Sequence, residues 1–386
     1  MKRLQHIGLC LLLFTATACN EDTSLIVPPF QNTDIPIRWK MQPVEGMQSS
    51  RALVEDDGTT TAEEILQNAC DADVAGSERI VIWGDYANVI NGQQTVKEGF
   101  FDGVNLAYYG ISAEEDSPTG WDYAGEDRYW TLGGTYKFRA YYPKNGVNIV
   151  SSSNATTFVF EWNSIQSQTD LLVAYKEVNT QNWNLSDPVP LDMQHALSAL
   201  KFNFRFVDGY YTDDKLTGCW LENTKDDDFS CVGIFVYGGS SDAENMTWAG
   251  AYAYEPGVEM YKWTYDAGIA IANNSGTDPN DMADDVITTA TAYTGGATSG
   301  GQYITNDGWL LVIPQQLSGE VCLCFTTEKG GSNIYRAKIP ANTGTDGSYK
   351  PGYKYNYTVN ISKTNLELDL SIAKWNKLDS SHDIKL

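Results

Sequence analysis

The 386-residue sequence has few of the residues that bind metals or act as catalytic bases. It contains 3 histidines and 7 cysteines, and none of them has the spacing of zinc ligands. No pair of carboxylates, and no nucleophile with its base, stands out in the sequence. We therefore expect a protein that is not an enzyme and that needs no metal or other cofactor.

Positive charge is also scarce. The chain has 26 lysines and arginines against 50 acidic residues, which gives a formal net charge of −24. Both nucleic acid and anionic lipid headgroups repel a chain of this charge. The composition therefore excludes nucleic acid as an expected partner, and it excludes membrane binding through a basic surface.

Long apolar runs are missing beyond the first 18 residues, since none approaches the roughly 20 residues of a transmembrane helix. Residues 1–18 have a basic start, a short apolar run and small residues before Cys19, which is the order of a signal peptide. Cys19 resembles the lipidated cysteine of a bacterial lipobox. We expect an exported lipoprotein, held at the outer membrane by acyl chains (palmitate) on Cys19. An ordinary signal cut near Ala18 is the alternative.

An alternating segment follows the expected lipid site, and it predicts a strand with one apolar face. The apolar residues of this strand are Ile35, Ile37, Trp39 and Met41. Pro36 removes one hydrogen-bond donor and indicates an edge position. The polar linker 48–51 ends in Arg51 and has the composition of a protease-sensitive segment. Residues 19–51 are thus expected to form a lipidated tether with a removable first strand.

The remaining sequence is dominated by short alternating segments with polar turns between them, a pattern typical of antiparallel β-sandwiches. One short helix is expected after a capping box at residues 61–64. A polar segment at 176–188 indicates a boundary between an N-terminal domain, 52–180, and a C-terminal domain, 181–386. The clearest strand segments are 80–83, 136–142, 158–162, 170–175, 200–206, 232–237, 309–313, 321–325, 353–361 and 366–372.

Two of the cysteines, Cys219 and Cys231, flank a polar acidic loop. They could form a disulfide in an oxidising compartment. Two separate thiols are the alternative reading.

Several segments, in order along the chain, together resemble the fimbrillin family, the Mfa-like shaft and accessory subunits of type V pili. They are Gly134–Pro143, Gln168–Ala174, Val189–Leu200, Ile313–Gln315, Gly352–Tyr355, and the closing Ile372 and Trp375. The resemblance implies an all-β chain of two tandem transthyretin-like Greek-key β-sandwich domains. It also implies a lipoprotein precursor, proteolysis after an arginine, and assembly by strand exchange with other pilus subunits, either copies of this chain or related fimbrillins.

This mechanism fits residues already identified. A cut between Arg51 and Ala52 would remove the lipid together with the strand 35–41, whereas Arg38 is a poorer protease target if that strand is paired. Loss of a strand exposes unpaired backbone groups, which template pairing with another chain. The expected donor is the C-terminal region 366–386 of a neighbouring subunit, whose alternating apolar residues are Leu366, Leu368, Leu370 and Ile372. Shaft, anchor and tip subunits are all compatible with this pattern.

A second class of function is also compatible with the sequence. A surface glycan-binding lipoprotein of β-sandwich type would keep its lipid and could use some of the 11 tryptophans and 23 tyrosines to stack on sugar rings. The two readings differ in what happens after export. The pilus reading requires cleavage near Arg51, and the glycan reading requires a retained lipid.

Overall fold

The computed structural model describes most of the chain beyond residue 30, and nearly all of its regular structure is β. The described residues are 31–43, 62–90, 93–110, 120–145, 148–149, 158–164, 168, 170–207, 213–225, 229–237, 246–273, 288–289, 309–317, 319–341 and 343–374. The all-β prediction is confirmed. Within these ranges, no helix has the length and apolar character needed to cross a membrane.

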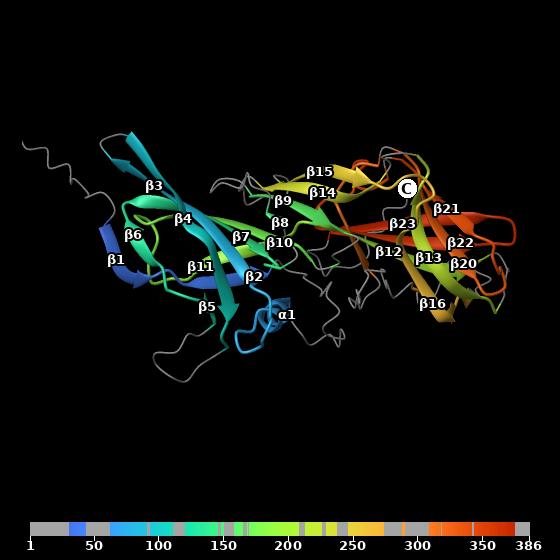
Figure 1. The fold of residues 1–386 in the computed structure, drawn as a ribbon, viewed down its shortest axis with the longest axis horizontal. Helices are drawn as coiled ribbons and strands as arrows, with labels where there is room; N and C mark the ends of the chain where they lie inside the picture. Colours follow the sequence, from blue (N-terminus) through green and yellow to red (C-terminus); the bar gives the residue numbers. More distant parts are fainter. Residues whose placement is uncertain are drawn as a thin grey trace, which may run out of the picture.

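The first half of the molecule is a closed barrel, seen on the left of Figure 1. Around the barrel the strands follow the order β10-β11-β2-β5-β4-β3-β7. Their bounds are β2 (Trp39–Pro43), β3 (Ile80–Ile90), β4 (Gln93–Tyr108), β5 (Trp121–Tyr123), β7 (Gly134–Tyr142), β10 (Leu172–Asn179) and β11 (Val189–His195). Its interior is rich in aromatic side chains, and closure pairs every barrel strand on both sides.

Two further elements lie beside the barrel. Strand β1 (Gln31–Pro36) pairs with β6 (Tyr129–Leu132) in a separate two-stranded sheet. Helix α1 (Ala62–Ala69) packs Leu66 and Ala69 against the barrel core, so the short helix expected after residue 61 is confirmed. The capping residue Thr61 lies outside the described residues.

The second half is a sandwich of two sheets, on the right of Figure 1. One sheet contains β12 (Ser198–Phe206), β17 (Ala272–Asn273), β18 (Thr288–Thr289), β19 (Trp309–Val312), β22 (Tyr353–Ile361) and β23 (Leu366–Lys374). The other contains β13 (Lys215–Asn223), β16 (Met260–Ala270), β20 (Val321–Thr327) and β21 (Tyr335–Ile339). Their facing side chains form one apolar core.

A third sheet connects the two halves. It has the order β15-β14-β9-β8, with β8 (Asn148–Ile149), β9 (Phe158–Asn163), β14 (Ser230–Tyr237) and β15 (Met246–Ala253). Its apolar side chains share a core with residues of β3, β7, β10 and β12. Strand β9 thus pairs with a strand of the later sequence, and β11 of the later sequence belongs to the barrel. The domain division at residue 180 stays a prediction.

Each predicted strand segment overlaps a strand of the structure, from residues 80–83 in β3 to residues 366–372 in β23. The pairing departs from the expected antiparallel pattern in some places. β2 runs parallel to β11, and β12 runs parallel to both β22 and β17. These pairs join segments that are far apart in the chain, so no local sequence pattern predicts them.

Candidate functional site in the N-terminal barrel

The segment predicted to be removable forms an integral strand of the barrel. β2 runs parallel to β11, from Trp39 opposite Val189 to Pro43 opposite Met193, and it meets β5 where Trp39 lies opposite Trp121. The expected edge position is therefore wrong for β2, because barrel closure gives it a neighbour on each side. The predicted edge position fits β1 better, since β1 pairs only with β6 among the described strands and ends at Pro36.

Two backbone hydrogen bonds hold the segment between β1 and β2. The Val189 N–H donates to the Arg38 carbonyl at 2.7 Å, and the Ile37 N–H donates to the Arg128 carbonyl at 2.8 Å. The predicted apolar face points inward at three of its four positions, since Ile37, Trp39 and Met41 are buried. Ile35 is 37% exposed because it belongs to β1 and lies outside the barrel wall.

Trp39 fills a pocket of aromatic rings inside the barrel. Its ring centroid lies 5.0 Å from that of Phe138, 5.9 Å from that of Phe101 and 6.3 Å from that of Tyr123, and all three contacts are edge-to-face. This geometry suits the quadrupoles of aromatic rings and adds to the apolar burial. Burial also raises the pKa of Tyr123, which keeps its phenol neutral at physiological pH. The pocket therefore joins β2 to β4, β5 and β7.

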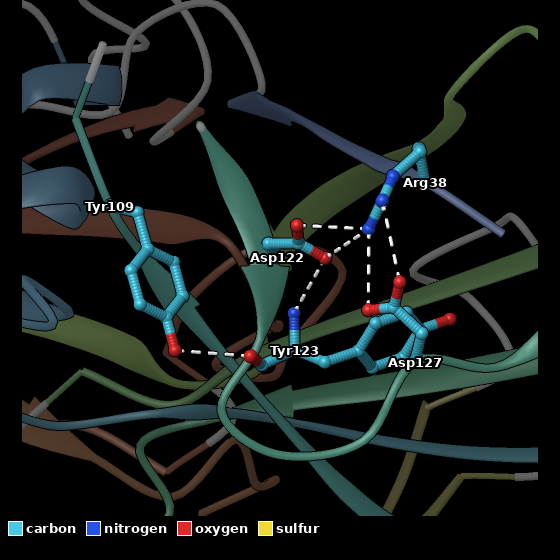
Figure 2. A network of polar contacts seen from close by, with 5 residues as sticks. All are labelled: Arg38, Tyr109, Asp122, Tyr123 and Asp127. Carbon is cyan, nitrogen blue, oxygen red and sulfur yellow. Dashed lines mark hydrogen bonds and ion pairs between the residues drawn. The ribbon is translucent and has the colours of Figure 1, made fainter. Parts of the chain in front are cut away.

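Arg38 points away from the barrel core and contacts two carboxylates (Figure 2). Its Nη1 donates to both oxygens of Asp122, at 2.7 and 2.9 Å, and to Oδ1 of Asp127 at 3.4 Å. Nη2 donates to Oδ2 of Asp127 at 3.4 Å. One guanidinium thus balances two negative charges, one on β5 and one in the turn that follows it.

The two carboxylates differ in their surroundings. The Asp122 side chain is only 8% exposed, and its Oδ1 also accepts the Tyr123 N–H at 2.9 Å. The Asp127 side chain is 34% exposed. A neighbouring hydrogen bond, from the Tyr109 hydroxyl to the Tyr123 carbonyl at 3.0 Å, ties the end of β4 to β5 (Figure 2). Asp122 is therefore a carboxylate that is held in place and nearly buried. The loss of its cation would strongly destabilise the fold.

We define the β2 site as the place of β2 between β11 and β5, with the Asp122 and Asp127 carboxylates on one side and the rings of Phe101, Tyr123 and Phe138 on the other. Sequence reasoning identified the strand but not these partners. The signal in the sequence is slight: a basic residue directly before a tryptophan, in a chain with an excess of acids.

The candidate donor residues lie in β23, which pairs antiparallel with β22 from Leu366 opposite Ile361 to Lys374 opposite Tyr353. This strand is at the edge of its sheet, as far as the described strands show. Its alternating apolar residues are partly buried against the core of the sandwich. They are Leu366, Leu368, Leu370 and Ile372. Glu367 and Asp369 alternate with them and are exposed. In this structure the candidate donor strand is thus paired within its own chain.

Three predicted processing residues, Cys19, Arg51 and Ala52, lie outside the described residues. The disulfide that the sequence allowed is not formed in the structure, where Cys219 and Cys231 are buried free thiols. The Cys231 sulfur lies 3.4 Å from that of Met260, and burial raises the pKa of this thiol to about 12. The Cys231 thiol is therefore protonated and unreactive at neutral pH.

His195 pairs with Asp170, its Nδ1 lying 2.6 Å from Oδ2. The His195 side chain is fully buried and that of Asp170 nearly so. The pair ties the end of β11 to the chain just before β10, next to the backbone hydrogen bond from Ala196 to Leu171. A structural role follows from this burial, because no substrate reaches the imidazole. No group of three or more metal-ligating side chains occurs among the described residues.

A second hollow lies in the C-terminal sandwich, with a volume of about 680 Å³. It opens between the edge strands β21 and β23 and includes the turn from Ser362 to Asn365. Its floor contains Phe206 and Phe325, and its rim contains Arg336 and Lys363. We call it the β21–β23 cavity.

Comparison with known proteins gives one family. Residues 69–375 match the family model described as Fimbrillin-like. Among solved structures, a fimbrial protein from Bacteroides vulgatus matches at 11% identity, with a TM-score of 0.46, over 77% of this chain and 92% of its own. A fimbrial assembly protein from Parabacteroides distasonis matches at 10% identity, with a TM-score of 0.30, over 76% and 87%. No curated protein matches the chain significantly.

Proposed function

The chain belongs to the fimbrillin-like family, and from this premise we propose that it is a structural subunit of an adhesive surface pilus, shaft or accessory, exported as a lipoprotein and assembled by strand exchange. A protein of this family is expected at the cell surface, in contact with other pilus subunits, and without catalytic activity.

The observation that carries the proposal is the place of β2. This strand is part of the barrel wall, yet it precedes Arg51 in the chain. A cut between Arg51 and Ala52 would leave β1 and β2 held only by noncovalent contacts. Their departure would leave the facing edges of β11 and β5 without a partner and the Trp39 pocket empty. Such an edge beside an apolar hollow is a template for a strand from another chain.

The same cut gives Cys19 a temporary role. The proposed lipid on Cys19 would hold the precursor at the outer membrane. Meanwhile β2 would occupy its place in the barrel wall and keep the precursor from binding other subunits. Because Cys19 and β2 lie on the same side of Arg51, one proteolytic event would release the membrane anchor and open the β2 site together.

The donor in this proposal is the C-terminal region of a neighbouring subunit, which contains Leu366, Leu368, Leu370 and Ile372. As the edge strand of its sheet, β23 separates from its own chain by breaking one ladder only, that with β22. Insertion of this region into the next barrel is a head-to-tail contact, and a head-to-tail contact that does not close on itself builds a filament.

The experiment is limited trypsin treatment of the purified precursor, followed by mass spectrometry, sedimentation and electron microscopy. We expect cleavage after Arg51, loss of the N-terminal segment and growth of filaments, whereas Arg51→Ala should remain a monomer. A chain that stays monomeric after a confirmed cut and loss of the segment would contradict the shaft role.

The alternative is a glycan-binding lipoprotein that keeps its anchor, and the β21–β23 cavity is the feature that favours it. Tyr335 and the polar residues Thr364 and Asn365 line the cavity. A retained lipid and saturable binding of oligosaccharides, lost in Tyr335→Ala, would support this function over the pilus role.

A further inference from the structure

The β2 site combines two features that an incoming strand must match at adjacent residues. One is the pair of carboxylates around Arg38, and the other is the ring pocket around Trp39. Building on the proposed strand exchange, we propose that the β2 site selects a strand with a basic residue directly before a tryptophan, and that in a second copy of this chain this pair is Lys374 and Trp375.

The β2 site requires a basic residue because two carboxylates of the site remain without a cation when β2 departs. Without Arg38, the Asp122 and Asp127 carboxylates would face each other's negative charge without a cation between them. The loss of the cation is more unfavourable for Asp122 than for Asp127, because Asp122 is nearly buried and held by the Tyr123 N–H. A buried carboxylate that loses its partner is strongly destabilising. A strand that brings lysine or arginine to this position removes the penalty, and an acidic residue there adds to it.

The demand for a large aromatic residue follows from the pocket. The rings of Phe101, Tyr123 and Phe138 all contact Trp39 with edge-to-face geometry. A smaller side chain would leave a cavity, and the penalty grows with the volume left empty. A leucine fills less of this space than an indole and offers no ring edge to the three faces.

The leucines of β23 do not satisfy the requirement for a basic residue in the place of Arg38. Side chains alternate along a strand, so the residue before the one in the pocket takes the place of Arg38. With Leu368 in the pocket that residue is Glu367, and with Leu370 it is Asp369. Either would place an acid against Asp122 and Asp127. With Ile372 in the pocket the residue is Ser371, which brings no charge.

The pair that does match lies at the end of the same region. A basic residue directly before a tryptophan occurs at Arg38–Trp39, Lys262–Trp263 and Lys374–Trp375. Lys262 lies inside β16, where release would disrupt the pairing with β13. Lys374 is the last residue of the edge strand β23, and Trp375 opens the final 12 residues of the chain. Lys374 belongs to the edge strand that the proposed exchange releases, so this third pair is the one that fits the donor role.

The same alignment identifies where the match is poor. With Trp375 in the place of Trp39, Ala373 takes the place of Ile37, and Lys377 takes that of the buried Met41. A lysine at this position must extend its ammonium group toward water, which weakens the fit. Lys377→Met should therefore bind more tightly than the natural sequence, an effect that the registers with Leu368, Leu370 or Ile372 in the pocket do not predict.

The test uses the chain cut after Arg51 and a synthetic peptide of residues 366–386, with binding followed by fluorescence anisotropy. We expect Lys374→Glu and Trp375→Ala to weaken binding at least about tenfold, the range of a close charge pair or an aromatic anchor. The register controls Asp369→Asn and Leu370→Ala should change it less than about threefold. Asp127→Lys in the protein should restore binding of the Lys374→Glu peptide.

Three outcomes decide the matter. If the peptide binds but depends on Leu370 and not on Lys374 or Trp375, the selection rule is overturned and strand exchange stands. If the cut chain polymerises with the Lys374→Glu substitution as fast as without it, the rule is also overturned. If the cut chain neither polymerises nor binds any form of the peptide, the proposed strand exchange itself fails, and the rule fails with it.

Discussion

The indole of Trp39 stands edge-on to the ring of Phe138, with centroids 5.0 Å apart and ring planes at 80°. This contact joins a strand that precedes Arg51 to the central part of the barrel that follows it. The precursor is thus stabilised by a segment that the proposed processing removes. The stability of the barrel and its readiness to assemble therefore depend on the same side chains.

Truncation of the buried indole should destabilise the barrel. We expect Trp39→Ala to lower the free energy of unfolding by about 3–5 kcal/mol, because it empties a pocket with aromatic walls. Urea unfolding, followed by tryptophan fluorescence and circular dichroism, measures the change. The matched control is Ile35→Ala, four residues earlier and 37% exposed, which should change the stability by less than about 1 kcal/mol. Equal effects of the two substitutions would place the segment outside the core.

The ion pair of Arg38 should show strong coupling with Asp122. We expect Arg38→Met to destabilise the fold by about 1–3 kcal/mol, because Asp122 then lies nearly buried without a cation. In the Asp122→Asn background the same substitution should have a much smaller effect, since no buried charge is left unpaired. A double-mutant cycle by urea unfolding measures the difference. Additive effects would mean that Asp127 and solvent already satisfy the guanidinium.

Proteolysis should discriminate between the two arginines that flank β2, Arg38 before it and Arg51 after it. Arg38 is fixed by its ion pairs and by the backbone hydrogen bond from Val189, so it should resist trypsin while the barrel is folded. Arg51 should be cut first, and Arg51→Ala should slow release of the segment by at least about tenfold. Mass spectrometry of timed digests follows both sites. Early cleavage at Arg38 would show that β2 leaves the barrel before processing.

The sequence contains the information for strands because alternation is local, and Tyr353–Ile361 and Leu366–Lys374 illustrate this well. No local pattern in the sequence predicts that the barrel closes. β2 and β11 are parallel neighbours, yet Trp39 and its partner Val189 are separated by most of the N-terminal half of the chain. For the same reason Asp122 could not be predicted to face Arg38. The edge assignment of the segment failed because Pro36 marks the end of β1, and β2 begins after it.

High pH should weaken the barrel through its buried tyrosines. Burial raises the pKa of Tyr136 from its ordinary value of 10 to about 12. The unfolded chain therefore releases this proton first, so the native state loses about 2–3 kcal/mol from this residue as the pH rises from about 10 to 12. Urea unfolding between pH 9 and 12 measures the loss, and Tyr136→Phe should remove this share of it. Tyr129→Phe is the control, because Tyr129 is 46% exposed. The same pH dependence in both variants would contradict the assignment.

The most direct test of the account is the N-terminus of the protein at the cell surface. Intact mass spectrometry and N-terminal sequencing of subunits sheared from intact cells should find a chain that begins at Ala52 and has no acyl chains, while the precursor inside the cell envelope begins at lipidated Cys19. A surface form in filaments that begins at Cys19 with its lipid attached would contradict the proposal that β2 and the lipid leave together before assembly.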